Sequence, residues 1–142
     1  RSSQVTVSNW MTNKVVSIGP DEPLFAGLEQ MAEQQIRHVM VLEDGHLRGI
    51  LSNRDVVRAT LANPERRLDL HGTTVAQVMT PTPLHTVMAG ESLAKAAEAF
   101  LYHKVNALPV IDGAGGVQGI LTSEDVLRAV FLAEAPIRRP DL

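Results

Sequence analysis

The sequence contains an internal repeat, and this repeat restricts the possible folds more than any other feature. The heptapeptide GILSNRD begins at Gly49, and the similar GILTSED begins 70 positions later, at Gly119. Segment 74–80 likewise repeats segment 6–12 at an offset of 68, with Thr-Val at its start and Met-Thr at its end. Self-similarity at one long period indicates a single supersecondary unit that the chain uses twice.

Each copy predicts the same order of elements, β-α-β-β-α. A short apolar strand comes first, followed by an amphipathic helix near Leu24 or Leu93, capped by Asp21 or Ser92. Two strands joined by a turn follow this helix, and a second helix then begins near Asn53 or Ser123. The predicted strands are residues 15–18, 38–42 and 47–51 in the first copy, and 84–87, 107–111 and 117–121 in the second.

The repeat also predicts the organisation of the chain. Residues 5–62 form the first copy and residues 74–133 the second, with a polar connector at 63–73 and a polar tail at 134–142. A copy of about sixty residues buries little surface by itself, so the two sheets are expected to pack together. The predicted fold is therefore α+β, with pseudo-twofold symmetry between the repeats and equivalent loops near one cleft.

Composition excludes several classes of function. The formal net charge of −3 disfavours nucleic-acid binding through phosphate neutralisation. No run approaches ~18 apolar residues, so no membrane span is expected, and the absence of a secretory segment suggests the cytoplasm. The chain has no cysteine, and its histidines lack metal-ligand spacing, so no metal site is predicted; these are His38, His46, His71, His85 and His103.

The heptapeptide has the residue types that bind a nucleotide. Gly49 permits close backbone approach because it lacks a β-carbon. Ser52 lies where the strand changes to a helix, and free amides at a helix N-terminus favour an anion such as phosphate. The carboxylate of Asp55, one turn into the helix, can accept two hydroxyl protons from a ribose diol, and Arg54 adds a positive charge beside it.

The same residues also fit a purely structural role. Ser-x-x-Asp and Thr-x-x-Asp are capping boxes, in which the third residue's carboxylate binds the N-cap amide. Capping alone does not explain why glycine recurs three residues before the hydroxyl, with two apolar residues between them, and this recurrence favours a ligand. Both interpretations stay open at this point.

The pattern G-h-h-[ST]-x-x-D resembles the CBS-domain motif, and so do the preceding segments IRHVMV and VNALPV. The resemblance covers residues 5 to 133 as two tandem copies, which together would make one CBS pair, or Bateman module. Such modules bind adenosine-containing ligands in clefts between the repeats. The resemblance therefore implies AMP, ADP or ATP, or alternatively S-adenosylmethionine, as a regulatory ligand, with no required cofactor.

The resemblance also implies the site residues. In the family the aspartate holds the ribose hydroxyls and the Ser or Thr meets the phosphate, while apolar side chains surround the adenine. The first copy would contribute Val15, Val16, Arg37, His38, Ile50, Ser52, Asn53, Arg54 and Asp55. The second copy would contribute Pro83, Leu84, Ile120, Thr122, Ser123 and Asp125.

The two copies differ at positions that bear on ligand binding. Met40 stands where the family usually has proline, which the second copy keeps as Pro109. Arg54 is replaced by Glu124 in the second copy, and a carboxylate repels a bound phosphate. From sequence, the Asp55 motif is therefore expected to be the stronger site.

The resemblance thus implies a regulatory module that binds an adenosyl small molecule. The lack of an evident nucleophile–base arrangement indicates that this module is non-catalytic. The alternative is a dimerisation or interaction module with vestigial sites that regulates a partner or attached enzyme. A homodimer is expected in either case, because apolar surface around Ala94, Ala97 and Leu101 is left for a second chain to cover.

Overall fold

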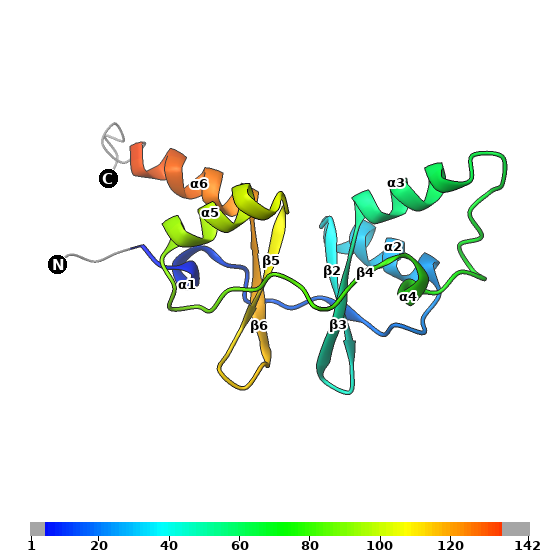
Figure 1. Cartoon of the computed structure of the whole chain (residues 1–142), viewed down its shortest axis with the longest axis horizontal. Coiled ribbons are helices and arrows are strands. Elements are labelled where there is room, and N and C mark those ends of the chain that lie inside the picture. Colours follow the sequence, from blue (N-terminus) through cyan, green and yellow to red (C-terminus); the bar gives the residue numbers. More distant parts are fainter. Residues whose placement is uncertain (1–4, 135–142) are drawn as a thin grey trace. The chain divides into compact units, whose positions relative to one another are not determined.

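A computed structural model describes residues 5–134, and Figure 1 shows the whole chain. The chain forms two compact units, each taken by itself below. The first unit is Lys14–Leu84, and the second unit combines residues 5–13 with the chain from His85 onward. Each unit therefore contains most of one repeat together with the opening turn of the other. Except for Glu134, the polar tail predicted at 134–142 lies outside the described residues.

The first unit contains a four-stranded sheet in the order β1-β2-β3-β4. Strand β1 is parallel to β2, while β2–β3 and β3–β4 are antiparallel. The β2–β3 hairpin turns at Asp44 and Gly45, which both have positive φ, as the Glu-Asp-Gly sequence predicts. The elements are β1 (Ser17–Ile18), α2 (Leu24–Gln34), β2 (His38–Glu43), β3 (His46–Ser52), α3 (Asn53–Ala62), α4 (Val75–Val78) and β4 (Thr80–Pro81).

The second unit contains a two-stranded antiparallel sheet, β5–β6, with an isolated bridge on each side. Thr12 bridges Ile120 in an antiparallel sense, and Val87 bridges Val110 in a parallel sense. The elements are α1 (Val7–Trp10), α5 (Leu93–His103), β5 (Ala107–Ile111), β6 (Val117–Thr122) and α6 (Ser123–Glu134).

Each unit has a hydrophobic core, and the opening turn of the other repeat is part of it. In the first unit, Val75 of α4 is fully buried among residues such as Leu24 and Leu51. In the second unit, Val7 of α1 is fully buried with residues such as Leu108 and Leu121. The two repeats have therefore exchanged their first turns.

The structure confirms most of the predicted elements. The hairpin strands agree within one residue at each end, and α3 and α6 begin at the predicted Asn53 and Ser123. Ser92 caps α5 by accepting the Lys95 amide at 3.1 Å, but the N-cap of α2 is Pro23 and not Asp21. Pro23 supplies the fixed φ that leads into a helix, although it offers no side-chain acceptor.

The opening strands differ more from the prediction. Residues 15–18 yield only the two-residue β1, and residues 84–87 yield only the bridge at Val87. The sequence did not predict β4, which pairs with β3 of the other repeat. Backbone pairing depends on the neighbouring chain as well as on local propensity, so a short strand of this kind carries little sequence signal.

Candidate functional site

The first strand-to-helix junction is built around Ser52 and the buried Asp55. Ser52 ends β3 and caps α3, and its Oγ accepts the Asp55 amide at 3.2 Å. Oδ2 of Asp55 accepts the Ser52 amide at 2.9 Å and the Ser52 hydroxyl at 3.1 Å. These contacts form a capping box, so the structural role proposed for this motif is confirmed.

The second carboxylate oxygen of Asp55 has two further partners. Oδ1 accepts Nη1 of Arg58 at 2.9 Å and the hydroxyl of Thr80 at 2.9 Å. The Asp55 residue is only 3% exposed, whereas the Arg58 side chain is 67% exposed. The buried charge is therefore held by the cap on one oxygen. On the other oxygen it is held by the ion pair with Arg58 and the hydrogen bond from the Thr80 hydroxyl.

The second junction repeats most of this arrangement. Oδ2 of Asp125 accepts the Thr122 amide at 2.8 Å and the Thr122 hydroxyl at 3.1 Å. Oδ1 accepts Nη2 of Arg128, whose side chain is 55% exposed. Asp125 is also 3% exposed. Asp55 and Asp125 are the polar or charged side chains in the buried core of residues 5–134.

The repeated glycine has a packing role. A β-carbon on Gly49 would meet the main-chain oxygen of Thr80, and one on Gly119 would meet the main-chain oxygen of Thr12. The glycines therefore allow the Met-Thr segment of the other repeat to cross the strand closely. This crossing explains why glycine recurs, so the glycine no longer favours a ligand over a cap.

Several predicted site residues of the first copy gather at the first junction. The Asn53 amide donates to the carbonyl of Arg37 at 3.1 Å, and His38 is paired with Ser52 across β2 and β3. Arg37, Asn53 and Arg54 are exposed, and His38 is half-buried. At the second junction, the half-buried Ser123 donates its amide to the carbonyl of Asn106 at 3.1 Å. The first cap thus lies next to residues of polar or charged type.

The predicted apolar residues are distributed differently from the expectation. Ile50 pairs with Thr80, and the Thr82 amide donates to the carbonyl of Arg48 at 2.9 Å, so the segment leading to Pro83 and Leu84 follows β3. Pro83 and Leu84 therefore belong to the unit of Ile50, although the sequence grouped them with Ile120. Val15 and Val16 are half-buried in the same unit, and the Val16 carbonyl accepts the Met40 amide at 3.0 Å.

Sequence reasoning missed two residues of these junctions. Thr80 binds Asp55 directly, and Thr12 occupies the corresponding position of the other repeat, beside Ile120. Both follow a methionine in the repeated Met-Thr pair, which was the available signal. It indicated a repeat without indicating which junction each threonine joins.

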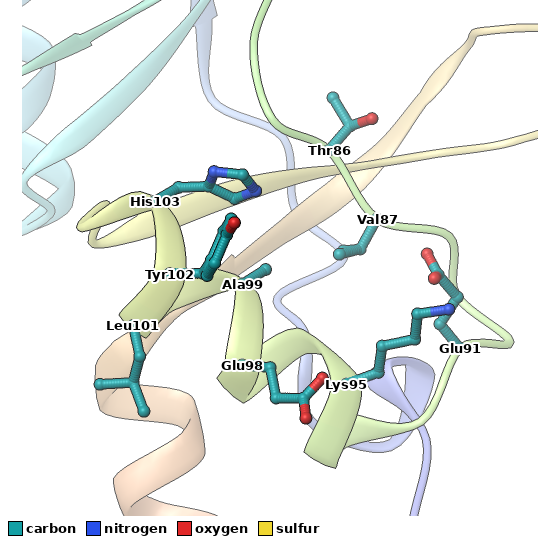
Figure 2. A pocket seen from close by; sticks show the side chains of 9 residues that line it. All are labelled: Thr86, Val87, Glu91, Lys95, Glu98, Ala99, Leu101, Tyr102 and His103. Atoms are coloured by element: carbon teal, nitrogen blue, oxygen red, sulfur yellow. The ribbon is translucent and has the colours of Figure 1, made fainter.

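A pocket of about 720 Å³ lies along α5 in the second unit, between that helix and segment 86–91 (Figure 2). Val87, Ala99, Lys95 and Glu98 are among the residues that line it (Figure 2). His103 also lines it and stacks on His85, with ring centroids 3.5 Å apart. None of the predicted site residues lines this pocket. The pocket and the two junctions are therefore separate features.

Two kinds of feature are absent from the described residues, namely metal-binding clusters and membrane-spanning helices. Within residues 5–134, no group of three or more His, Cys, Asp or Glu side chains is arranged to hold a metal ion. In the same part of the chain, no helix has the length and apolar character needed to cross a bilayer.

Comparison with known proteins gives a consistent result. A family model described as the CBS domain matches residues 7–62 and again residues 75–132. An inosine-5'-monophosphate dehydrogenase of Halalkalibacterium halodurans is 31% identical over 112 residues, which are 78% of this chain and 21% of that enzyme. The chain thus spans about a fifth of the length of that relative.

Solved structures match nearly the whole chain. A crystal structure of a CBS domain protein is 27% identical, with a TM-score of 0.82, and covers 91% of this chain and 99% of its own. CBSX2 in complex with AMP is 28% identical, with a TM-score of 0.75 and coverages of 92% and 98%. The CBS domain pair of MJ0100, with 5'-methylthioadenosine and S-adenosyl-L-methionine, is 20% identical, with a TM-score of 0.81 and coverages of 93% and 100%.

The α+β architecture, the two adjacent family matches and the repeated capped aspartate agree with one another. The chain belongs to the CBS-domain family, as a tandem CBS pair.

Proposed function

We propose that this CBS pair is a non-catalytic regulatory module that binds an adenosine-containing ligand, with AMP, ADP and ATP ahead of S-adenosylmethionine. The observation that carries the proposal is the pair of buried carboxylates, Asp55 and Asp125, at equivalent strand-to-helix junctions. The AMP complex of CBSX2, at 28% identity, supports AMP as the first ligand to test.

In this proposal the junction residues divide the ligand between them. Asp55 and Asp125 accept the ribose hydroxyls, while Ser52 and Thr122, with the first amides of α3 and α6, face the phosphate. The exposed Arg37 and Arg54 add positive charge at the first junction. The apolar residues that would surround the adenine are Val15, Val16, Ile50, Pro83, Leu84 and Ile120.

Calorimetry with AMP and GMP tests this function. The adenine is selected by apolar contacts and main-chain groups, so AMP is expected to bind in the micromolar-to-millimolar range and GMP at least tenfold more weakly. AMP at a hundredfold excess over its Kd should stabilise the fold by about 2.7 kcal/mol. This stabilisation would raise the unfolding midpoint by roughly 5–10 °C.

A matched control separates ribose binding from nonspecific binding of the anion. The double variant D55N/D125N keeps an oxygen acceptor at each cap but removes both charges, so it should fold and lose most AMP affinity. If AMP, ADP, ATP, S-adenosylmethionine and NAD at millimolar concentration all leave the wild-type midpoint unchanged, the ligand-binding proposal is wrong.

A second candidate function is an interaction module that dimerises or controls a partner or attached enzyme. The supporting observation is the apolar surface of α5 and α6, where Leu101 is 81% and Tyr102 84% exposed. Leu127, Val130 and Phe131 of α6 are exposed as well. A helix face of this kind commonly marks a protein–protein contact. A homodimer formed through this face is compatible with either function.

A further inference from the structure

The two junctions differ in how many hydrogen-bond donors fill each carboxylate. An ionised carboxylate has acceptor sites for about four donors. Asp55 accepts four, from the Ser52 amide and hydroxyl, Arg58 and Thr80. Among donors in residues 5–134, Asp125 accepts three, from the Thr122 amide and hydroxyl and from Arg128. Within the described residues, all four acceptor sites of Asp55 are therefore filled, whereas Asp125 has three of its four filled.

The difference comes from Thr80, because no hydroxyl of the other repeat bonds Asp125 among the described residues of the second unit. Thr80 belongs to the two-residue strand β4, paired with Ile50, and the following Thr82 amide is anchored on β3. This anchoring holds the Thr80 hydroxyl 2.9 Å from Asp55. Thr12 makes only the isolated bridge to Ile120, and in the part of the chain that the structure describes its hydroxyl makes no bond to Asp125.

We propose that the two ligand sites are inequivalent, that the ribose of an adenosyl ligand is taken first at Asp125, and that Thr80 lowers affinity at Asp55 by competing for its carboxylate. This inference rests on the proposed function and deepens it. Thr80 is a positioning residue here, because it acts through Asp55.

The number of hydrogen bonds that the ribose must displace decides which of the two sites binds ligand first. A ribose cis-diol brings two hydroxyl protons to the carboxylate. At Asp125 the diol uses the remaining acceptor site and displaces only Arg128, whose exposed side chain can turn to water. At Asp55 it displaces both Arg58 and the Thr80 hydroxyl. One additional charge-assisted hydrogen bond is therefore lost at Asp55.

This order reverses the one expected from the sequence. The replacement of Arg54 by Glu124 made the second motif look weaker for an anion, but both are exposed side chains on the first turns of their helices. Water and salt screen exposed charges strongly, whereas the Thr80 bond engages the buried acceptor itself. The number of donors on the buried carboxylate therefore affects ribose binding more than the exposed charges do.

Calorimetry with AMP tests the inference, on variants in which one of the two aspartates is replaced by the neutral asparagine. D125N should abolish the tighter binding event, and the remaining event then reports the Asp55 site. Adding Thr80→Val to D125N removes the competing hydroxyl at nearly constant volume and should tighten the remaining event about five- to tenfold. Thr80→Ser in the same background keeps the hydroxyl and should leave the affinity unchanged.

Thr12→Val in a D55N background is the matched control, because Thr12 holds the corresponding position without bonding Asp125. It should leave the AMP affinity of the Asp125 site within twofold. The inference is overturned if D55N removes the tighter event, or if Thr80→Val leaves the Asp55 event unchanged or weakens it, while AMP still binds the wild type. Absence of any AMP binding to the wild type would instead overturn the proposed function, and this inference with it.

Discussion

A β-carbon on Gly49 would lie 2.6 Å from the main-chain oxygen of Thr80, closer than nonbonded atoms approach one another. The two residues are in different copies of the repeat, so this contact joins the strand of one copy to the opening segment of the other. Gly119 and Thr12 make the corresponding contact in the second unit. The glycine of each heptapeptide is thus required where the opening segment of one repeat crosses a strand of the other repeat.

Replacing either glycine should destabilise the unit that contains it. Because the neighbour is backbone, it cannot move aside as a flexible side chain can, so Gly49→Ala and Gly119→Ala should each lower the free energy of unfolding by about 2–3 kcal/mol. Gly90→Ala is the control, since its β-carbon meets nothing within 4 Å. Chemical denaturation measures all three, and a Gly49→Ala variant as stable as Gly90→Ala would contradict the close crossing.

Removing a capped carboxylate should also cost stability, whether or not ligand is present. Asp55→Ala deletes an acceptor for the Ser52 amide and for Thr80, so a loss of about 2–3 kcal/mol is expected. The Arg58 ion pair adds little to this figure, because the arginine is mostly exposed to water.

Two further variants give stability losses with which the loss for Asp55→Ala can be compared. Asp125→Ala should cost somewhat less, because within residues 5–134 no threonine bonds Asp125 in the way that Thr80 bonds Asp55. Asp21→Ala, at an exposed position, should change stability by less than about 0.5 kcal/mol. Thermal and urea unfolding without ligand provide the measurement, and equal values for Asp21→Ala and Asp55→Ala would mean that the cap contributes nothing.

The exchange of opening turns predicts which unit each core substitution weakens. Val7 and Val75 are fully buried, so Val7→Ala and Val75→Ala should each cost about 2 kcal/mol. Amide hydrogen exchange should show faster exchange in β5 and β6 for Val7→Ala, and in β2 and β3 for Val75→Ala. Val5→Ala, at an exposed position, is the control. The reverse pattern would indicate that each turn packs on its own repeat.

The proposed dimer makes a separate prediction. Light scattering at micromolar concentration should give about twice the chain mass of 15.4 kDa. Leu101→Glu and Phe131→Glu place charges on the exposed apolar face of α5 and α6, so each should shift the mass toward that of one chain. Met88→Gln changes an exposed apolar residue outside these helices and should leave the dimer intact. A wild-type mass near 15.4 kDa throughout this range would rule out the dimer.

Much of the local structure was predictable because its causes are local. The cap of α3 joins Ser52 to Asp55, three residues apart, and its residue types alone indicate where the helix begins. The Asp44-Gly45 turn, the hairpin strands and the order of elements in each repeat were predictable for the same reason. The 70-residue period identified the tandem repeat before any contact was known.

The sequence by itself determined that one unit is used twice and that each copy carries a hydroxyl and an aspartate three residues apart at the start of a helix. Only the tertiary structure decided which opening turn packs into which core. It therefore also decided that Thr80 binds Asp55, whereas in the described part of the chain Thr12 makes no hydrogen bond to Asp125. Thr80 and Asp55 are 25 residues apart, and no local propensity joins them. Their contact depends on a chain crossing that is stabilised by burying Val75, so the asymmetry between two nearly identical motifs is a property of packing.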